Sequence, residues 1–195
     1  MNKKSAIGDN VKWGFTRRLE YMNVYIEKLL VSDAEDLYKF ELENRSNFEK
    51  MVPSRGDDYY IPEIFKKRHE ALLEEQVQGD SYFYLIKDKD SSILGRINLV
   101  DIDASHKIGH LGYRVGKAHT GKGIASNALK LLIETVIDKD IKQIKAKTTT
   151  NNKASQKVLE KNGFERIATD DEEFEMHGQK ISFVYYILTI GGSSY

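Results

Sequence analysis

The chain has 195 residues, which is enough for one domain with a sizeable hydrophobic core. Its 40% hydrophobic and 31% charged residues are typical of a globular protein. The 30 Lys and Arg side chains balance the 30 Asp and Glu side chains, so no overall basic field exists to attract nucleic acid or an anionic membrane. The absence of cysteine excludes disulfides, thiolate catalysis and cysteine-based metal sites.

Neither a membrane anchor nor a secretory signal is expected. The longest apolar run lies at 181–190 and is about half as long as a membrane-spanning helix. The basic residues near the start are followed by no apolar stretch, so we expect a cytoplasmic location. We expect residues 1–20 to be a polar N-terminal segment that could be mobile, residues 21–190 a single domain, and residues 191–195 a flexible tail.

The hydrophobic pattern switches repeatedly between a strand period and a helix period. It predicts the order β-α-α-β-β-β-α-β-α-β-β, with the second helix beginning near Pro62, a residue that a first helical turn tolerates well. The strands are expected at 22–26, 82–86, 93–102, 107–115, 141–148, 164–168 and 181–190, and the two later helices at 121–137 and 152–162. Three meandering strands followed by a β-α-β crossover indicate a mixed sheet covered by helices.

A glycine-containing loop joins a predicted strand to a predicted helix. The strand at 107–115 leads into the segment His119-Thr120-Gly121-Lys122-Gly123-Ile124-Ala125. Glycine lets the backbone approach a ligand closely, and the free N–H groups and dipole of a helix start favour an anion. The spacing is neither that of a P-loop nor that of the dinucleotide fingerprint. The loop alone therefore leaves two interpretations open, a phosphate cradle and a tight connection without a ligand.

Further motifs on both sides of this loop occur in a fixed order. They are Gly112-Tyr113-Arg114-Val115 before it, and Asn152-Lys153-Ala154-Ser155 with the run from Val158 to Phe164 after it. Together with the loop they resemble the GNAT superfamily of N-acetyltransferases, and within it the Rim-type enzymes that acetylate the N-terminal alanine of ribosomal protein S5. Upstream segments match as well, at Glu43-Asn44-Arg45, at Pro53 with Arg55, and at residues 80–84, so the resemblance covers residues 21–190.

The resemblance implies an α/β fold of the α+β kind, with a mixed, mostly antiparallel sheet of about seven strands and a splayed parallel pair. It also implies that acetyl-CoA is the co-substrate, and that its acetyl group passes directly to an amine without an acyl-enzyme intermediate. The residues that would bind acetyl-CoA are Tyr113, Val115, His119, Thr120, Gly121, Lys122, Gly123, Ile124, Ala125, Asn152 and Ser155.

Two positions depart from the superfamily pattern. Ala118 stands where many members have Gln or Arg, so Lys122 becomes the expected source of positive charge at the loop. Leu159 stands where many members have the tyrosine that reprotonates the thiolate. The Rim-type branch has a serine at the position of Ser155, which makes Ser155 the candidate acid. The hydroxyl of a serine near a helix start could equally form its hydrogen bonds with local backbone groups and have no role in catalysis.

The candidate base and the acceptor contacts are supported by fewer features of the sequence. Histidine as a residue type can gain or lose a proton near neutral pH, so His110 could take the proton of the amine, although an exposed strand histidine is the simpler interpretation. The acceptor contacts suggested by position are Glu43, Asn44, Arg45, Arg96 and Asn98. The acidic run at 170–175 is either a solvated hairpin or an attractor for a cationic acceptor. The sequence has no pair of histidines at ligand spacing with a matching carboxylate, so we expect no metal site.

Three functions remain open from the sequence. The first is acetylation of an N-terminal α-amine, with a ribosomal protein as the expected partner and a monomer or homodimer as the expected assembly. The second is acetylation of a small amine such as a polyamine or an amino-sugar antibiotic. The third is a non-catalytic acyl-CoA-binding module, which Leu159 in place of the tyrosine leaves possible.

Overall fold

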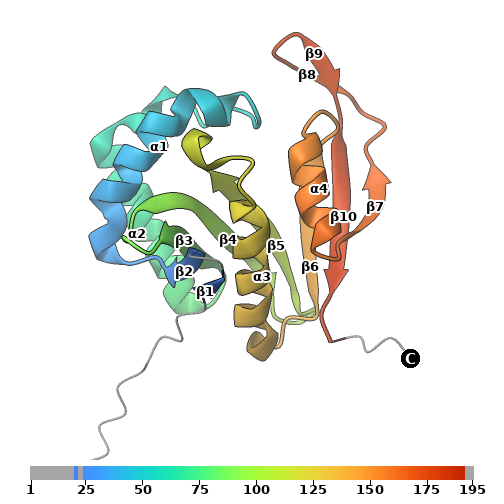
Figure 1. Ribbon diagram of the computed structural model, residues 1–195, viewed down its shortest axis with the longest axis horizontal. Helices are drawn as coiled ribbons and strands as arrows, with labels where there is room; N and C mark the ends of the chain where they lie inside the picture. Colours follow the sequence, from blue (N-terminus) through green and yellow to red (C-terminus); the bar gives the residue numbers. More distant parts are fainter. Residues whose placement is uncertain (1–19, 22–23, 192–195) are drawn as a thin grey trace, which may run out of the picture.

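The computed structural model describes residues 20–21 and 24–191 (Figure 1). The expected N-terminal segment, apart from Glu20, and residues 192–195 of the expected tail lie outside the described residues. The helices are α1 (Ala34–Glu49), α2 (Pro62–Gln78), α3 (Ile124–Val136) and α4 (Lys153–Lys161). The strands are β1 (Glu20–Tyr21), β2 (Val24–Lys28), β3 (Tyr82–Asp88), β4 (Ile93–Asp103), β5 (Ile108–Val115), β6 (Gln143–Thr149), β7 (Glu165–Thr169), β8 (Phe174–Met176), β9 (Gln179–Ile181) and β10 (Phe183–Thr189).

The main sheet has eight strands in the order β1-β2-β3-β4-β5-β6-β10-β7. Every neighbouring pair is antiparallel except β5 and β6, which are parallel because α3 crosses over between them. The mixed, mostly antiparallel sheet predicted from the sequence is therefore confirmed, with one more strand than expected because the two-residue β1 pairs with β2. A separate hairpin also forms, since the strand expected at 181–190 is interrupted at Ser182 and its first part pairs with β8.

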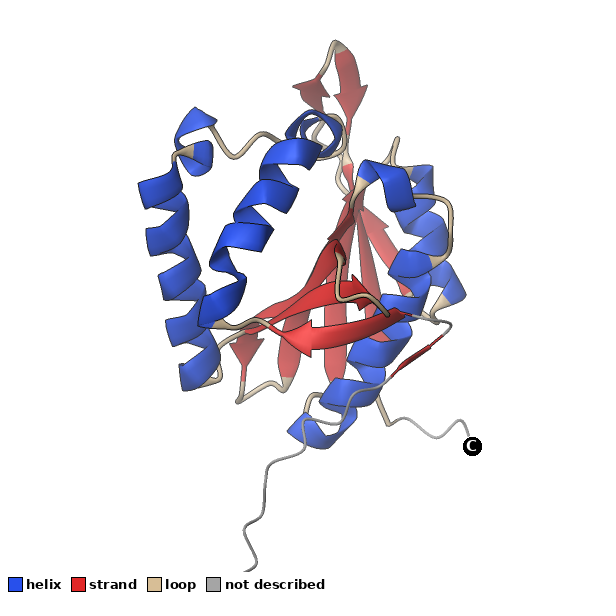
Figure 2. Cartoon of the chain, turned by 60° about the vertical axis from the view of Figure 1, so that its left-hand side comes forward, coloured by secondary structure: helices blue, strands red, loops and turns tan. Residues whose placement is uncertain are grey.

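Helices cover both faces of this sheet, and each face has its own core (Figure 2). Successive side chains of a strand point to opposite faces. In β3, Phe83 and Leu85 pack with Leu37 of α1. The alternate residues Tyr84 and Ile86 belong to the core that contains Leu129 of α3. The sheet is thus buried on both sides, with α1 and α2 on one face and α3 and α4 on the other.

The parallel pair splays apart along its length. Backbone pairing between β5 and β6 runs from Ile108 opposite Gln143 to Leu111 opposite Ala146 and stops there. Both strands continue, β5 to Val115 alongside β4 and β6 to Thr149 alongside β10. The sheet consequently opens between residues 112–115 and 147–149, and the splayed parallel pair expected from the resemblance is confirmed.

Candidate active site

The backbone that borders the opening is available to a ligand. Residues 112–115 of β5 pair with β4 on one side, but on the other side β6 has already separated from them. Backbone N–H and C=O groups on that side need partners, because leaving them buried and unpaired is costly. An extended ligand that enters the opening can supply these hydrogen bonds in the manner of a missing strand.

The glycine loop presents a row of free amide donors. Gly121 and Gly123 have φ of +75° and +77°, and nothing stands within 4 Å of the place that a Cβ would occupy on either. Among the described residues, the first backbone donor after Thr120 that finds an acceptor is the amide of Asn127, which donates to Gly123. The N–H groups of residues 121–126 are therefore available together at the start of α3, where the helix dipole also favours an anion.

A second contact fixes the position of this loop against α1. The backbone N–H of Lys117 donates to Oδ1 of Asn44 at 2.8 Å. A Cβ added at Gly116 would come within 3.0 Å of the Phe40 ring, so glycine allows the loop to lie directly on α1. Asn44, expected from position as an acceptor contact, instead anchors the loop.

Beside the loop lies a cavity of about 440 Å³, here called the loop cavity. It extends from the start of α3 to the start of α4. The sequence-predicted residues that line it are Tyr113, Val115, His119, Thr120, Gly121, Gly123, Ile124, Ala125, Asn152 and Ser155. Lys122, expected to supply charge at the loop, is exposed and is not part of the lining.

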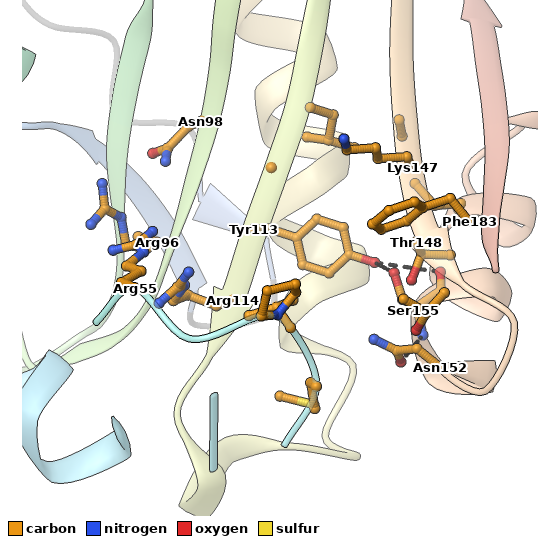
Figure 3. Close-up of a pocket in the computed structure, with 18 residues that line it drawn as sticks. Arg55, Arg96, Asn98, Tyr113, Arg114, Lys147, Thr148, Asn152, Ser155 and Phe183 are labelled. Atoms are coloured by element: carbon orange, nitrogen blue, oxygen red, sulfur yellow. Dashed lines mark hydrogen bonds between the residues drawn. The ribbon is translucent and has the colours of Figure 1, made fainter. Parts of the chain in front are cut away.

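Ser155 is joined to the splayed strand by a side-chain hydrogen bond. The hydroxyl of Tyr113 lies 2.9 Å from Oγ of Ser155, across the opening in the sheet (Figure 3). Oδ1 of Asn152 accepts from the backbone N–H of Ser155 at 3.1 Å and so caps α4. Burial raises the pKa of Tyr113 to about 12, although the hydrogen bond from Ser155 acts in the opposite direction. Tyr113 is consequently a protonated hydroxyl at neutral pH and can donate to Ser155.

A second cavity of about 410 Å³, here called the gap cavity, occupies the opening itself. Its lining comes from both faces of the sheet: Arg96, Asn98, Gly112 and Arg114 on the face of α1, and Leu111, Tyr113, Ser155 and Leu159 on the face of α4. The loop cavity and the gap cavity share the residues Met51, Val52, Tyr113, Arg114, Asn152 and Ser155. Two ligands that enter from different sides would therefore meet next to Tyr113 and Ser155.

The wall of the gap cavity opposite Ser155 is cationic (Figure 3). Glu41 of α1, which is fully buried, accepts from Arg96 at 3.0 Å and from Arg114 at 3.0 Å, and Arg55 lies 3.7 Å away. Burial alone would raise the pKa of Glu41, but the charges of these three arginines outweigh it and the pKa is lowered. We call Arg55, Arg96 and Arg114 the arginine cluster.

The sequence analysis did not identify Glu41 as part of the site. One signal was present, since Glu41 follows Leu37 by four residues and precedes Phe48 by seven, which places a charged residue on the buried stripe of α1. A buried glutamate needs cationic partners. The strands that supply them, β4 and β5, lie 55 and 73 residues further along the chain.

The other expected residues are distributed unevenly around the site. Arg96 and Asn98 line the gap cavity, and their role as acceptor contacts stays a prediction. Glu43 is exposed on α1, and Arg45 pairs with Glu49 and Asp57, so neither lines a cavity. His110 lies on β5 on the same face as Gly112, but its side chain is exposed and outside both linings.

Within residues 24–191 we find no group of three or more His, Asp or Glu side chains arranged to hold a metal ion. No helix in the described part of the chain is long and apolar enough to cross a membrane.

The sheet splays at one parallel pair, with the free amides of the glycine loop on one side of the opening and a second cavity at the opening itself. The sequence matches the acetyltransferase (GNAT) domain family over residues 23–165, and the chain belongs to this family of acetyltransferases. The resemblance stated from the motifs is thereby confirmed.

Similar proteins agree with this assignment. The chain is 30% identical over 163 residues to the probable N-acetyltransferase YjcK of Bacillus subtilis, covering 82% of this chain and 90% of that protein. The ribosomal-protein-S5-alanine acetyltransferase of Vibrio fischeri has the same fold, with a TM-score of 0.81 at 22% identity over 90% of this chain and 97% of that one. RimL, an L7/L12 α-N-protein acetyltransferase solved with coenzyme A, has a TM-score of 0.80 at 19% identity over 89% of this chain and 97% of that one.

Proposed function

We propose that this acetyltransferase uses acetyl-CoA and transfers the acetyl group directly to a primary amine, in particular the N-terminal α-amine of a ribosomal protein. The observation that carries the proposal is the junction of the two cavities at Tyr113 and Ser155. In the proposed complex, acetyl-CoA lies in the loop cavity with its pyrophosphate on the amides of residues 121–126. The acceptor enters the gap cavity from the face of α1.

The residues at the junction fit the chemistry of this reaction. The lone pair of a neutral amine forms a bond to the thioester carbonyl carbon, and the C–S bond breaks. The thiolate then takes a proton from Oγ of Ser155, which Tyr113 replaces through its 2.9 Å hydrogen bond. The proton lost by the amine leaves to solvent and a proton from solvent returns to Tyr113, so the net products are the amide and coenzyme A. In this proposal Ser155, with Tyr113 behind it, supplies the proton that Leu159 cannot.

The choice of acceptor is supported by the proteins that the chain resembles. The solved structures with the same fold include enzymes named for ribosomal proteins S5 and L7/L12. A gap cavity of about 410 Å³ also fits a small amine, which is therefore the second candidate acceptor.

One assay distinguishes these possibilities. The protein is incubated with labelled acetyl-CoA, intact ribosomal proteins and a panel of small amines, and the label is located by mass spectrometry. Label on a protein N-terminus is the expected result, and label on small amines alone would support the second candidate. Tight binding of coenzyme A without transfer to any amine would contradict both and leave a non-catalytic acyl-CoA-binding module.

A further inference from the structure

The gap cavity carries more positive charge than its structural contacts require. Among the described residues that line it, four have cationic side chains, Arg55, Arg96, Arg114 and Lys147, and none has an acidic one. The only carboxylate at the arginine cluster within the described chain is Glu41, which has no exposed surface. Three guanidinium groups around one carboxylate leave a net charge of +2 at this wall, since arginine stays protonated.

The guanidinium groups also have unused donors. Within the part of the chain that is described, Arg96 and Arg114 each donate one hydrogen bond, in both cases from Nη1 to Glu41. A guanidinium has five N–H donors in a fixed fork that matches carboxylate or phosphate oxygens. Side chains that served only to hold α1 on the sheet would be expected to balance one another's charge, because buried unpaired charge is costly.

A polar atom next to the cluster is unpartnered as well. Oδ1 of Asn98, two residues after Arg96 on β4, is buried and accepts no hydrogen bond from any described residue. Asn98 lines the gap cavity and lies beside the arginine cluster (Figure 3). Because Asn98 lines the cavity, a small rotation of its side chain would let Oδ1 accept an N–H group of a ligand there.

We propose that the arginine cluster and Asn98 form the acceptor-recognition site, and that the acceptor amine carries a nearby anionic group such as a carboxylate. The inference rests on the proposed function and adds the substrate class to it. The anion binds the free donors of the cluster, and an N–H of the acceptor binds Oδ1 of Asn98. The same positive wall disfavours an ammonium ion, so it promotes the neutral amine that the transfer needs.

Two sources of such an anion can be compared directly. One is an acidic side chain next to a peptide N-terminus, and the other is the α-carboxylate of a free amino acid. The first pair of acceptors is therefore two peptides that begin Ala-Asp and Ala-Asn and are otherwise identical. The second pair is serine and serinamide. The quantity measured is the ratio of kcat/KM within each pair, at a fixed saturating concentration of acetyl-CoA.

We expect the anionic member of at least one pair to be preferred by at least tenfold, as charge-assisted hydrogen bonds predict. Arg55→Gln should bring this ratio close to one, since Arg55 is the least buried arginine of the cluster and the furthest from Glu41. Arg68→Gln is the matched control. Arg68 also lies over the Tyr59 ring, but it pairs with Asp58 and lines neither cavity, so its ratio should stay at the wild-type value.

The outcomes separate the two proposals. Equal kcat/KM within both pairs, or a ratio that Arg55→Gln leaves unchanged, would overturn the anion site while the proposed transfer to amines stands. Binding of coenzyme A by calorimetry without transfer to any acceptor would overturn the proposed function and this inference with it. The preferred pair identifies the source of the anion, a peptide side chain or a free α-carboxylate.

Discussion

The two cavities that meet at Ser155 are built in different ways. The loop cavity presents backbone amides from one continuous segment, residues 121–126, and these donors depend on the backbone shape that Gly121 and Gly123 allow rather than on side-chain groups. The wall of the gap cavity presents side chains from α1, β4, β5 and the segment before α2, held together by one buried carboxylate. A site made of backbone survives wide sequence change, whereas a site made of side chains can be altered one residue at a time. In the proposed complex the donor side would therefore be general and the acceptor side specific.

Loss of the charge of Glu41 is expected to have the largest effect. Glu41→Gln leaves buried guanidinium groups without a counter-charge, and breaking such a pair costs about 3 kcal/mol or more in the free energy of unfolding. Urea denaturation measures this change. Glu43→Gln, on the exposed face of the same helix, is the matched control and should stay within about 0.5 kcal/mol of the wild type. Equal stability of the two variants would show that the arginine cluster does not depend on Glu41.

The same carboxylate makes stability depend on pH. The pKa of Glu41 is lowered in the folded chain because the arginines outweigh the effect of burial. Its contribution to stability is therefore fully present above the ordinary value of 4.5 and is lost as the pH falls from there through the lowered pKa. The difference in unfolding free energy between wild type and Glu41→Gln should shrink over that window. A difference that is constant from pH 7 into the acid range would contradict this account.

The backbone cradle can be tested with a single glycine. Gly123→Glu places a side chain at φ of +77° and a carboxylate among the free amides. We expect the Kd for coenzyme A to rise by at least about 100-fold in calorimetry. Gly178→Glu introduces the same charge at a φ of +73° in the turn between β8 and β9, away from both cavities, and should bind coenzyme A normally. Normal binding by Gly123→Glu would place the pyrophosphate elsewhere.

The junction of the cavities should affect turnover more than binding. Ser155→Ala is expected to lower kcat by about 100-fold and Tyr113→Phe by about tenfold, with the KM for acetyl-CoA little changed, because in the proposed mechanism Ser155 protonates the thiolate and Tyr113 replaces that proton. Tyr185→Phe is the control for Tyr113→Phe, since the Tyr185 hydroxyl binds Asp170 outside both cavities. If Ser155→Ala and Tyr113→Phe both keep the wild-type kcat, the proton that the thiolate takes must come from water.

The smallest effect is expected at His110. Its imidazole is exposed and does not line either cavity, so His110→Ala should change kcat/KM by less than about threefold. The measurement is a pH profile of kcat/KM for both proteins. If the variant loses the acid limb of the wild-type profile, His110 is the base, as the sequence analysis considered.

The backbone-built side of the molecule could be predicted from the sequence, for a physical reason. The φ preferences of Gly121 and Gly123, and the hydrophobic periods on either side of them, act over short stretches of chain. They predict a strand, a loop and a helix in the right order. The resemblance to a known family then supplied the splay between β5 and β6, which no local pattern reveals.

The side-chain-built wall was predicted only in part, because it depends on contacts between distant segments. Arg96 and Asn98 were expected from their place on a central strand. Glu41, which joins two arginines from different strands, carries no motif of its own. A hairpin was one interpretation of the acidic run at 170–175, but the strands β8 and β9 were not predicted, because the break at Ser182 that separates Ile181 from β10 leaves no mark on the apolar run.

A crystal structure of the protein with coenzyme A tests the central claim most directly. We predict pyrophosphate oxygens within about 3 Å of the amide nitrogens of residues 121–126, and the thiol at the opening beside Oγ of Ser155. The arginine cluster should then remain free for the acceptor. Phosphate oxygens bound instead to Arg55, Arg96 and Arg114 would contradict the account, because the gap cavity would then belong to the donor.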